Sequence, residues 1–495
     1  MKIFMSPMPS RVLFVCSEAR PFASTGGLAD VSGALPAELI REGVPVDRVM
    51  PLYRKVLDGQ ESGGYRVERT PMTLSIPLGG EEIPAEIHVT EYSGGLTYFI
   101  GCEEFFDRTE LYALPHREYR DNYHRFLFFQ KAVVALVDAL GAPYDVVHLN
   151  DWQTGMVPLF LQHGIRGTGR TNREHTVMTV HNLAYQGIYP STGLYHTNLP
   201  GNMLSQYPEL EYYGNINFLK AGLVTADRVN TVSPTYAEEI LTPEFGCGLE
   251  GVLEYLKTPV MGIVNGVDTD DWNPETDKHL PATYTRRALK GKGTCKEKLC
   301  KELGFESTKE DLPLFVVVTR LVEQKGLEIL KQAMEHFMSL PVRFALLGSG
   351  QAEYHEWVKE ANQRWPDTFK GILGYDSGLS HRMEAGGDFF LMPSRFEPCG
   401  LNQLYSLRYG TLPIVNPTGG LKDTVVDLRN NPDKGTGFHL RSYTSESLLE
   451  CIRDASALYH QKAELRKVRQ RAMAVDVSWS KTAGEYLKLY EDAMA

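Results

Sequence analysis

The sequence predicts an α/β protein with two doubly wound, mostly parallel sheets. Short runs rich in β-branched residues alternate with longer amphipathic runs along the whole chain, which is the pattern of repeated strand–helix units. The length of 495 residues is enough for two large domains, and 42% hydrophobic with 23% charged residues is typical of a globular protein. Each half of the chain is therefore expected to carry its own sheet, with the ligand site in the cleft between the halves.

Buried strands are predicted where short apolar, β-branched runs occur. These runs are residues 11–16, 146–149, 176–180, 228–232, 260–264, 314–319, 343–347, 389–392 and 412–415. Between the two halves, residues 268–310 are polar and poor in apolar side chains, with Trp272-Asn273-Pro274 near their start. We expect this stretch to be the connection between two domains.

The composition excludes several classes of partner. A net charge of -11, without a basic stripe that carries interleaved aromatic residues, argues against nucleic acid. No run of about 18 apolar residues suggests a membrane span, and residues 1–7 are too short and broken for a signal peptide. The seven cysteines are scattered and form no C-x-x-C, so we expect a cytoplasmic protein without structural zinc.

Two cations and one carboxylate follow predicted strands of the second half. Arg320 and Lys325 come after strand 314–319, and Glu397 lies in the loop beyond strand 389–392. Open α/β sheets bind ligands at the carboxyl ends of their strands. An Arg and a Lys there would neutralise a diphosphate leaving group, and a carboxylate accepts hydrogen bonds from sugar hydroxyls. Taken singly, these residues are more simply a surface Arg, a surface Lys and a loop Glu.

Glycine-rich turns follow three predicted strands. Residues 24–30 follow the first strand, residues 418–423 follow strand 412–415, and Gly348-Ser349-Gly350 follows strand 343–347. Paired glycines allow close backbone approach, and the next helix offers its N-terminal amides to a phosphate. One such turn alone is more simply a tight turn, whereas three in two half-sheets favour a phosphate or nucleotide ligand.

Two histidines are candidates for contacts at strand ends. His181 stands at the end of strand 176–180, before a polar loop that ends at Gly187, and is a candidate sugar contact or a satisfied loop residue. His148 is the weaker candidate and is compatible with a structural role. They lack the i, i+4 spacing of a helical metal pair, so no metal site is predicted.

Taken together, these blocks resemble the bacterial glycogen synthases and plant starch synthases over essentially the whole chain. The matching blocks are residues 25–30, Asp151-Trp152, the block around His181, residues 231–234 and 265–268, Arg320 with residues 324–326, the block around Glu397, and residues 418–420. Because many separate blocks occur in order, chance recurrence is negligible.

The resemblance implies a GT-B fold, with two Rossmann-like doubly wound domains facing across a deep cleft. It implies an N-terminal domain, residues 1–268, on the acceptor side, completed by a C-terminal helix at 476–495, and a donor domain at 269–475. The implied reaction transfers glucose from ADP-glucose to the non-reducing end of an α-1,4-glucan such as glycogen, with retention of configuration and without metal or other cofactor. The alternatives are UDP-glucose as donor, a phosphorylase that carries pyridoxal phosphate, and a glucan-binding protein with weakened catalysis.

The resemblance also implies residue roles. Arg320 and Lys325 would stabilise the departing diphosphate, Glu397 would bind the donor glucose, His181 would position it, and Asp30 would line the sugar site. The donor-binding set would comprise Ser24, Gly26, Gly27, Asn265, Tyr375, Cys399, Gly400, Leu401, Thr418, Gly419 and Gly420.

One position departs from the family pattern. The glycine loop of the family usually begins with Lys, and this chain has Ser24 there. The missing cation is expected to weaken phosphate or acceptor contacts, or to leave the task to another base such as Lys220 or Lys422. Tyr405, eight residues after Glu397, matches the glycogen synthase branch, because some related retaining transferases carry a second Glu there.

Overall fold

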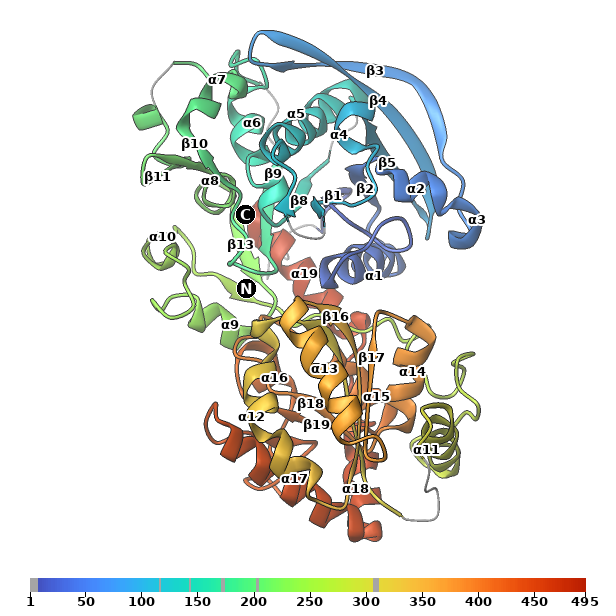
Figure 1. Ribbon diagram of the computed structural model, residues 1–495. Helices are drawn as coiled ribbons and strands as arrows, with labels where there is room; N and C mark the ends of the chain where they lie inside the picture. The colour runs from blue at the N-terminus through green and yellow to red at the C-terminus, as the bar shows by residue number, and fades with distance from the viewer. Residues whose placement is uncertain (1–7, 115–116, 142–143, 171–173, 202–203, 306–310) are drawn as a thin grey trace, which may run out of the picture. The chain divides into compact units, whose positions relative to one another are not determined.

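The chain forms two compact units, Met1–Asn265 together with Trp479–Ala495, and Gly266–Ser478 (Figure 1). The structure is a computed structural model that describes residues 8–114, 117–141, 144–170, 174–201, 204–305 and 311–495. Each unit has its own sheet and its own buried core.

The sheet of the first unit is parallel through its centre and antiparallel at one edge. Its strands lie in the order β14 (Met261–Gly262), β13 (Arg228–Thr231), β9 (His175–Val180), β8 (Val146–Asn150), β1 (Val12–Val15), β2 (Val46–Pro51), β5 (Gly95–Gly101), β4 (Glu81–Tyr92) and β3 (Glu68–Leu78). All strands predicted in this half are present, as β1, β8, β9, β13 and β14. The hairpin β3–β4 was not predicted, because only apolar runs were taken as strands, whereas β3 alternates exposed and half-buried side chains along most of its length. Such alternation is itself typical of a strand with one exposed face.

The remaining elements of the first unit are mostly helical. The helices are α1 (Gly27–Arg41), α2 (Arg54–Asp58), α3 (Gln60–Gly63), α4 (Glu103–Phe106), α5 (Asn122–Leu140), α6 (Val157–His163), α7 (Leu194–Thr197), α8 (Phe218–Thr225), α9 (Pro234–Glu239), α10 (Glu250–Glu254) and α19 (Trp479–Met494), with the 3₁₀ turns η1 (Trp152–Thr154), η2 (Ser191–Gly193) and η3 (Leu204–Gln206). Two small sheets consist of β6 (Ala113–Leu114) with β7 (Arg117–Glu118), and of β10 (Ile188–Pro190), β12 (Asn215–Asn217) and β11 (Glu211–Tyr212).

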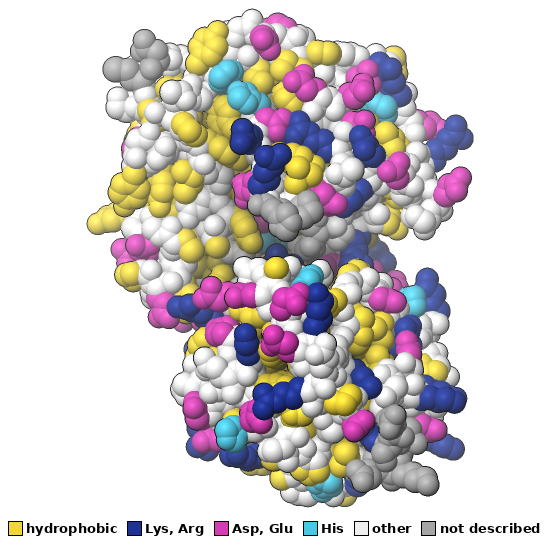
Figure 2. Space-filling model, viewed as in Figure 1, with side chains coloured by type: hydrophobic (Ala, Val, Ile, Leu, Met, Phe, Trp, Pro, Cys, Tyr) yellow, Lys and Arg dark blue, Asp and Glu magenta, His cyan; other side chains and the backbone are white. Residues whose placement is uncertain are grey.

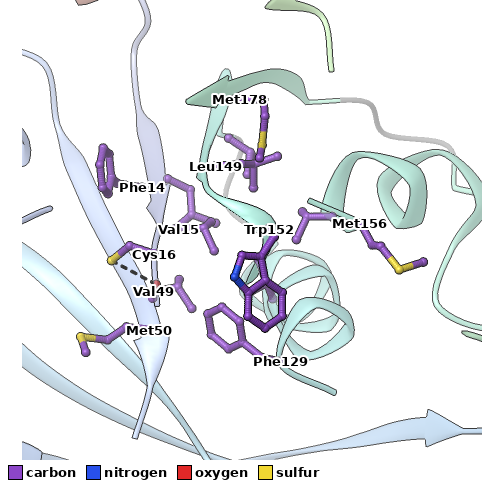
Figure 3. Packing of buried hydrophobic residues seen from close by; sticks show 14 of the residues in the cluster. Phe14, Val15, Cys16, Val49, Met50, Phe129, Leu149, Trp152, Met156 and Met178 are labelled. Carbon is purple, nitrogen blue, oxygen red and sulfur yellow. Dashed lines mark hydrogen bonds between the residues drawn. The ribbon is translucent and has the colours of Figure 1, made fainter. Parts of the chain in front are cut away.

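The core of the first unit joins the sheet to its helices. Val15 of β1, Leu149 of β8 and Phe129 of α5 are fully buried, and Figure 3 shows them around the ring of Trp152. The C-terminal helix α19 packs beside α1, and the hydroxyl of its buried Tyr490 lies 2.7 Å from Nδ1 of His148. His148 is therefore a buried structural residue, which agrees with its lower rank as a sugar contact.

The sheet of the second unit is entirely parallel. Its strands lie in the order β17 (Phe369–Leu373), β16 (Arg343–Gly350), β15 (Leu314–Leu321), β18 (Phe389–Met392), β19 (Leu412–Val415) and β20 (Phe438–His439). The helices are α11 (Lys290–Glu302), α12 (Leu327–Met338), α13 (Ala352–Arg364), α14 (Ser377–Gly386), α15 (Asn402–Tyr409), α16 (Gly419–Thr424), α17 (Ser445–His460) and α18 (Lys462–Ala472), with the turn η4 (Glu323–Lys325).

Strand β15 shows why the apolar runs of this half were predicted correctly. Phe315 and Val317 belong to one buried cluster, whereas Leu314, Val316 and Val318 belong to the cluster on the other face. Successive side chains of a strand point to opposite faces, so a strand covered on both faces is apolar at every position.

The predicted turn at Gly348–Gly350 is wrong. These residues continue strand β16, where Gly348 pairs with Thr319 and Gly350 pairs with Leu321. A Cβ atom on Gly348 would lie 2.2 Å from the carbonyl oxygen of Thr319, and one on Gly350 would lie 2.2 Å from that of Leu321. Glycine is needed here because two strands approach closely, and the sequence alone does not distinguish this from a turn.

The prediction that residues 268–310 connect two domains is also wrong, because residues 268–305 are part of the second unit; residues 306–310 lie outside the described residues. The ring of Trp272 stacks between those of His381 and Tyr405, with centroid distances of 3.8 Å on both sides. The hydroxyl of buried Tyr284 donates to the carbonyl oxygen of Tyr409 at 2.8 Å. Helix α11 packs beside α14. A few large aromatic side chains anchor a segment whose average composition is polar.

The surface agrees with the charge pattern of the sequence. On the face shown in Figure 2, Lys and Arg side chains lie among Asp and Glu side chains rather than in a continuous stripe. Within the described ranges, none of the helices has both the length and the apolar character that a membrane crossing requires.

Candidate functional site

The predicted site residues of the second unit gather at the carboxyl edge of its sheet. Strands β15, β18 and β19 are neighbours and run parallel, so the loops that follow them leave from the same edge. Arg320 lies near the end of β15, Glu397 lies in the loop after β18, and Gly419 begins the helix after β19. This edge is where open α/β sheets bind ligands.

An ion pair forms the centre of this edge. Nζ of Lys325 donates to Oε2 of Glu397 at 2.6 Å, and Oγ of Ser394 donates to the same oxygen at 3.1 Å. Glu397 is only 6% exposed, and hydrogen bonds from a cation and a hydroxyl offset the cost of burying its carboxylate. The structure thus brings together the cation and the carboxylate that the sequence placed 72 residues apart.

Backbone contacts fix the loops around this ion pair. The amide of Arg395 donates to the carbonyl oxygen of Gln324 at 2.9 Å, which ties the Glu397 loop to the Lys325 turn. The amide of Gly420 donates to the carbonyl oxygen of Glu397 at 3.2 Å. Gly419 has a φ of +44°, and a Cβ atom there would lie 2.1 Å from the same carbonyl oxygen. The second glycine turn is therefore required for contact between two loops of the site.

The other predicted donor residues of this unit lie at or after the carboxyl ends of its strands, with varied exposure. Arg320 is exposed and makes no ion pair with any side chain in the described part of the chain, and Tyr375, after β17, is 70% exposed. Both side chains are open to a ligand. Cys399 and Thr418 are buried, and Gly400 and Leu401 lead into α15.

The first glycine turn is held by a carboxylate that sequence reasoning missed. Glu18, 5% exposed, accepts the amide of Thr25 at 2.5 Å and that of Gly26 at 3.2 Å. Burial raises the pKa of Glu18, and these amides oppose the shift. The amide of Gly26 would have to leave Glu18 before it could bind a phosphate. Ser24 and Gly27 are exposed beside it.

Asp30 follows this turn on α1. Its carboxylate pairs with Nε of Arg20 at 2.7 Å. A sugar hydroxyl at this carboxylate would therefore share it with a cation that is itself 43% exposed.

His181 has a defined tautomer. Nδ2 of Asn150 donates to the carbonyl oxygen of Val15 at 3.0 Å, so Oδ1 of Asn150 faces Nε2 of His181 at 2.9 Å. Nε2 must therefore carry the proton, which leaves Nδ1 as an acceptor. Burial lowers the pKa of His181 to about 3, so the ring is neutral at physiological pH.

Asp151 lies beside His181 in a strained conformation. It has φ +57° and ψ -176°, a region that residues other than glycine rarely adopt, and Oδ1 accepts the amide of His181 at 2.7 Å. Burial raises the pKa of Asp151 to about 7, although the amides of His181 and Asn182 oppose that shift. Such strain persists only where the surrounding structure requires it, so Asp151 is a positioning residue for the His181 loop.

Two more candidate residues differ in their freedom to bind a ligand. Asn265 is 6% exposed, and its Oδ1 has no hydrogen-bond partner among the described residues, so a ligand hydroxyl there would satisfy a buried acceptor. Lys220 is a candidate substitute for the cation missing at Ser24. Its Nζ donates instead to the carbonyl oxygens of Pro208 and Glu211.

No metal centre is evident in the part of the chain that is described. Groups of three or more His, Cys, Asp or Glu side chains that could hold a metal ion do not occur among those residues.

Two α/β units, one with a parallel sheet and one with a sheet that is parallel through its centre, have the architecture of two-domain glycosyltransferases of the GT-B class. Solved structures agree. The fold matches starch synthase IV from Arabidopsis thaliana with a TM-score of 0.89, 30% identity and coverage of 99% of this chain and 100% of that one. It also matches the sucrose-phosphate synthase of Thermosynechococcus elongatus with a TM-score of 0.59 at 17% identity, over 97% of this chain and 98% of that one, which supports the fold alone.

The sequence comparisons identify the family. Residues 11–255 match the starch synthase catalytic domain, and residues 301–472 match the glycosyl transferases group 1. The chain is 43% identical over 485 residues to the glycogen synthase of Opitutus terrae, covering 98% of this chain and 100% of that one. It is 42% identical to glycogen synthase 2 of Geobacter sulfurreducens, with 98% and 99% covered. The chain belongs to the glycogen and starch synthase family.

Proposed function

We propose that this protein transfers glucose from ADP-glucose to the non-reducing end of an α-1,4-glucan, with retention of the anomeric configuration. The observation that carries the proposal is the Lys325–Glu397 pair at the carboxyl edge of the second sheet, with Arg320 exposed on the adjoining strand. Together they provide two cations for a diphosphate and a carboxylate for sugar hydroxyls.

The chemistry follows from these charges. As the bond between glucose C1 and the β-phosphate oxygen breaks, negative charge grows on the diphosphate and positive charge on the sugar ring. Arg320 and Lys325 would meet the negative charge, and each fixed donor of this kind is worth about 3 to 4 kcal/mol when lost. Glu397 would accept hydrogen bonds from the glucose hydroxyls and stabilise the oxocarbenium-like ring. No metal is needed for this charge balance.

Retention is proposed to occur by displacement on one face of the sugar. A carboxylate nucleophile must be free to reach C1, whereas Glu397 is buried and held by Lys325 and Ser394. The leaving phosphate would take the proton from the acceptor 4-hydroxyl, so the C1–O bond to the phosphate breaks as the bond to the acceptor oxygen forms. Nδ1 of neutral His181 would accept a hydrogen bond from the donor glucose.

The choice of ADP-glucose rests on similarity. Starch synthase IV from Arabidopsis thaliana was solved bound to ADP and acarbose, and its fold matches this chain over 99% of the length. ADP is the nucleotide that this protein would release from ADP-glucose. UDP-glucose is the alternative donor for the same mechanism.

The test is release of nucleoside diphosphate with glycogen as acceptor, comparing ADP-glucose with UDP-glucose, with Glu397→Ala as control. We expect glycogen-dependent release from ADP-glucose, little from UDP-glucose, and at least about a hundredfold loss in the control. Activity should survive EDTA, and the new linkage should be α by proton NMR. Faster release of nucleoside diphosphate from UDP-glucose would identify UDP-glucose as the donor. No release from either nucleotide sugar would favour a glucan-binding protein.

A further inference from the structure

The second unit contains a basic cavity at the edge of the sheet opposite to the candidate site. Its volume is about 680 Å³. It is lined by Arg343, the first residue of β16, by Asp388, directly before β18, and by Asp311, shortly before β15. These positions are at the amino ends of the strands, whereas Arg320 and Glu397 follow the carboxyl ends. The cavity is therefore separate from the proposed catalytic site.

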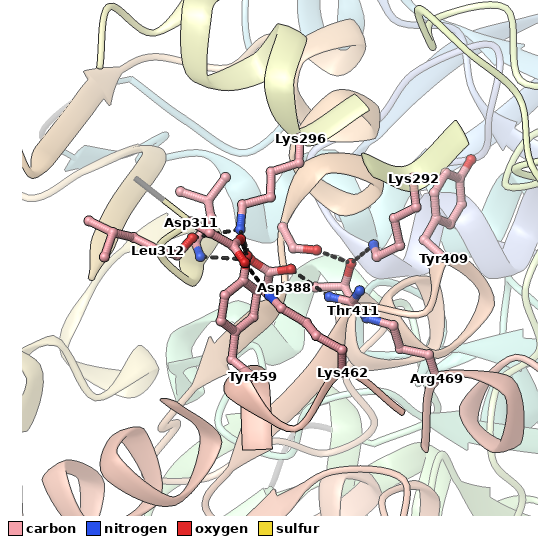
Figure 4. A network of polar contacts seen from close by, with 12 residues as sticks. Lys292, Lys296, Asp311, Leu312, Asp388, Tyr409, Thr411, Tyr459, Lys462 and Arg469 are labelled. Carbon is pink, nitrogen blue, oxygen red and sulfur yellow. Dashed lines mark hydrogen bonds and ion pairs between the residues drawn. The ribbon is translucent and has the colours of Figure 1, made fainter. Parts of the chain in front are cut away.

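Cations outnumber carboxylates in this cavity. Of the seventeen lining residues in the described part of the chain, seven are Lys or Arg and three are Asp or Glu. Figure 4 shows the centre, where buried Asp388 accepts Nζ of Lys296 at 2.6 Å and Nη2 of Arg469 at 2.5 Å. Lys462 pairs with Asp311 at 2.6 Å. Asp388 and Asp311 therefore form ion pairs with three of the seven cations, namely Lys296, Arg469 and Lys462.

Two buried basic side chains make no ion pair with a described carboxylate. Arg343 is 5% exposed; its Nη1 donates to the sulfur of Cys300 at 3.9 Å, and its guanidinium lies 5.8 Å from the centroid of the Phe305 ring. Lys292 is 3% exposed, and its Nζ donates to Oγ1 of Thr411 at 2.6 Å and to the carbonyl oxygens of Ala385 and Glu384 at 3.0 and 3.4 Å. Burial lowers the pKa of Lys292 well below its usual value. Neither makes an ion pair with a carboxylate in the described ranges. Buried charges are normally paired, and an Arg cannot escape the cost by losing its proton.

The cavity contains further hydrogen-bond donors that could bind an anion. Nε of Arg469 is buried and has no hydrogen-bond partner among the described residues. Lys290 and Arg466 on the rim are exposed and form no ion pair with a described side chain. The cavity also includes the start of α11, a helix of 13 residues whose first turn has no side-chain cap and attracts anions.

The geometry points to a binding site for a phosphorylated small molecule in this cavity. Its phosphate would lie between Arg343 and Arg469, and its remaining part would contact Tyr459 and Leu465. The volume is within the range of small-molecule pockets, about 300 to 1,000 Å³. A purely structural network would not need buried cations in excess of its carboxylates.

The test uses inorganic pyrophosphate as the probe and isothermal titration calorimetry as the measurement. To remove binding at the catalytic site, the background carries Arg320→Ala, Lys325→Met and Glu397→Gln, which deletes both members of the buried ion pair. The test is therefore independent of the proposed function. We expect pyrophosphate to bind this background with one site per chain.

Two matched pairs of substitutions then locate the site. Lys290→Ala with Arg466→Ala should raise the Kd at least tenfold. Lys298→Ala with Lys301→Ala removes the same charge from exposed positions of α11 outside the cavity, and should change the Kd less than twofold. Absence of binding to the background, or equal loss in both pairs, would overturn the inference. Arg343→Met tests the buried centre and should abolish binding; if it fails to fold, the rim pair still decides.

Discussion

The ion pair between Lys325 and Glu397 should make two separable contributions, one to stability and one to turnover. The perturbation is a double-mutant cycle of Lys325→Met, Glu397→Gln and the two substitutions combined. The charged atoms are 2.6 Å apart, and the two side chains are 16% and 8% exposed. At an effective dielectric constant of 20, the Coulomb attraction is about 6 kcal/mol, most of it offset by the cost of desolvation.

The expected magnitudes follow from what each substitution leaves behind. Either single substitution leaves one mostly buried charge unpaired, so each should lower the free energy of unfolding by about 3 kcal/mol. The double substitution leaves no charge, so its loss should be smaller than the sum of the two by about 2 kcal/mol. Turnover should fall at least about a hundredfold in all three variants, because the ligand groups are gone in each.

Hydrogen exchange across a urea series, measured on peptides from β15 and β18, reports the stability of the second unit itself. Nucleoside diphosphate release reports turnover. A coupling energy below about 0.5 kcal/mol would refute the stabilising interaction between the two side chains. Near-normal turnover in the folded double variant would refute their catalytic role.

Three other variants test single residues. Arg320→Ala should lower turnover at least about a hundredfold and change the free energy of unfolding by less than about 0.5 kcal/mol, since the side chain is exposed; Arg364→Ala, in a surface ion pair, is the control and should leave turnover normal. Ser24→Lys should lower the KM for donor or glucan without changing the product. Unchanged KM values would contradict the hypothesis that a cation is missing at this position. Burial raises the pKa of Glu384, 1% exposed, from 4.5 to about 8, so the folded protein keeps a proton that the unfolded chain releases between these values. Its stability relative to Glu384→Gln should therefore fall by about 1.4 kcal/mol per pH unit from pH 5 to pH 8, and parallel urea midpoints over that range would contradict this.

The sequence predicted those strands that are buried on both faces, because such strands are apolar at every position. Strand β15 is apolar at every position from Leu314 to Val318 because both of its faces are covered. Strand β3 was missed because the prediction relied on apolar runs, although the alternating exposure of its side chains is typical of a strand with one exposed face. Residues 268–310 were misassigned because a few aromatic anchors, Trp272 above all, hold a segment that is otherwise polar.

Some residues of the candidate site could be predicted from the sequence and others could not. Lys325 and Glu397 were predicted because charged side chains that follow several parallel strands, taken as a group, are typical of a ligand site. Glu18 and Asn150 were missed because they act on backbone amides and on another side chain, and a sequence does not show which partners a polar group will find. The positive φ of Asp151 has no signature in the residue type, since such conformations favour glycine.

The place of α19 in the first unit has a consequence for synthesis on the ribosome. Tyr486 and Tyr490 are fully buried in the first core, yet they are translated after every residue of the second unit. The first unit therefore emerges early but cannot complete its core, and the gap at His148 and its neighbours stays open until the last helix is released. The second unit, continuous in the chain, can finish folding earlier than the unit that precedes it.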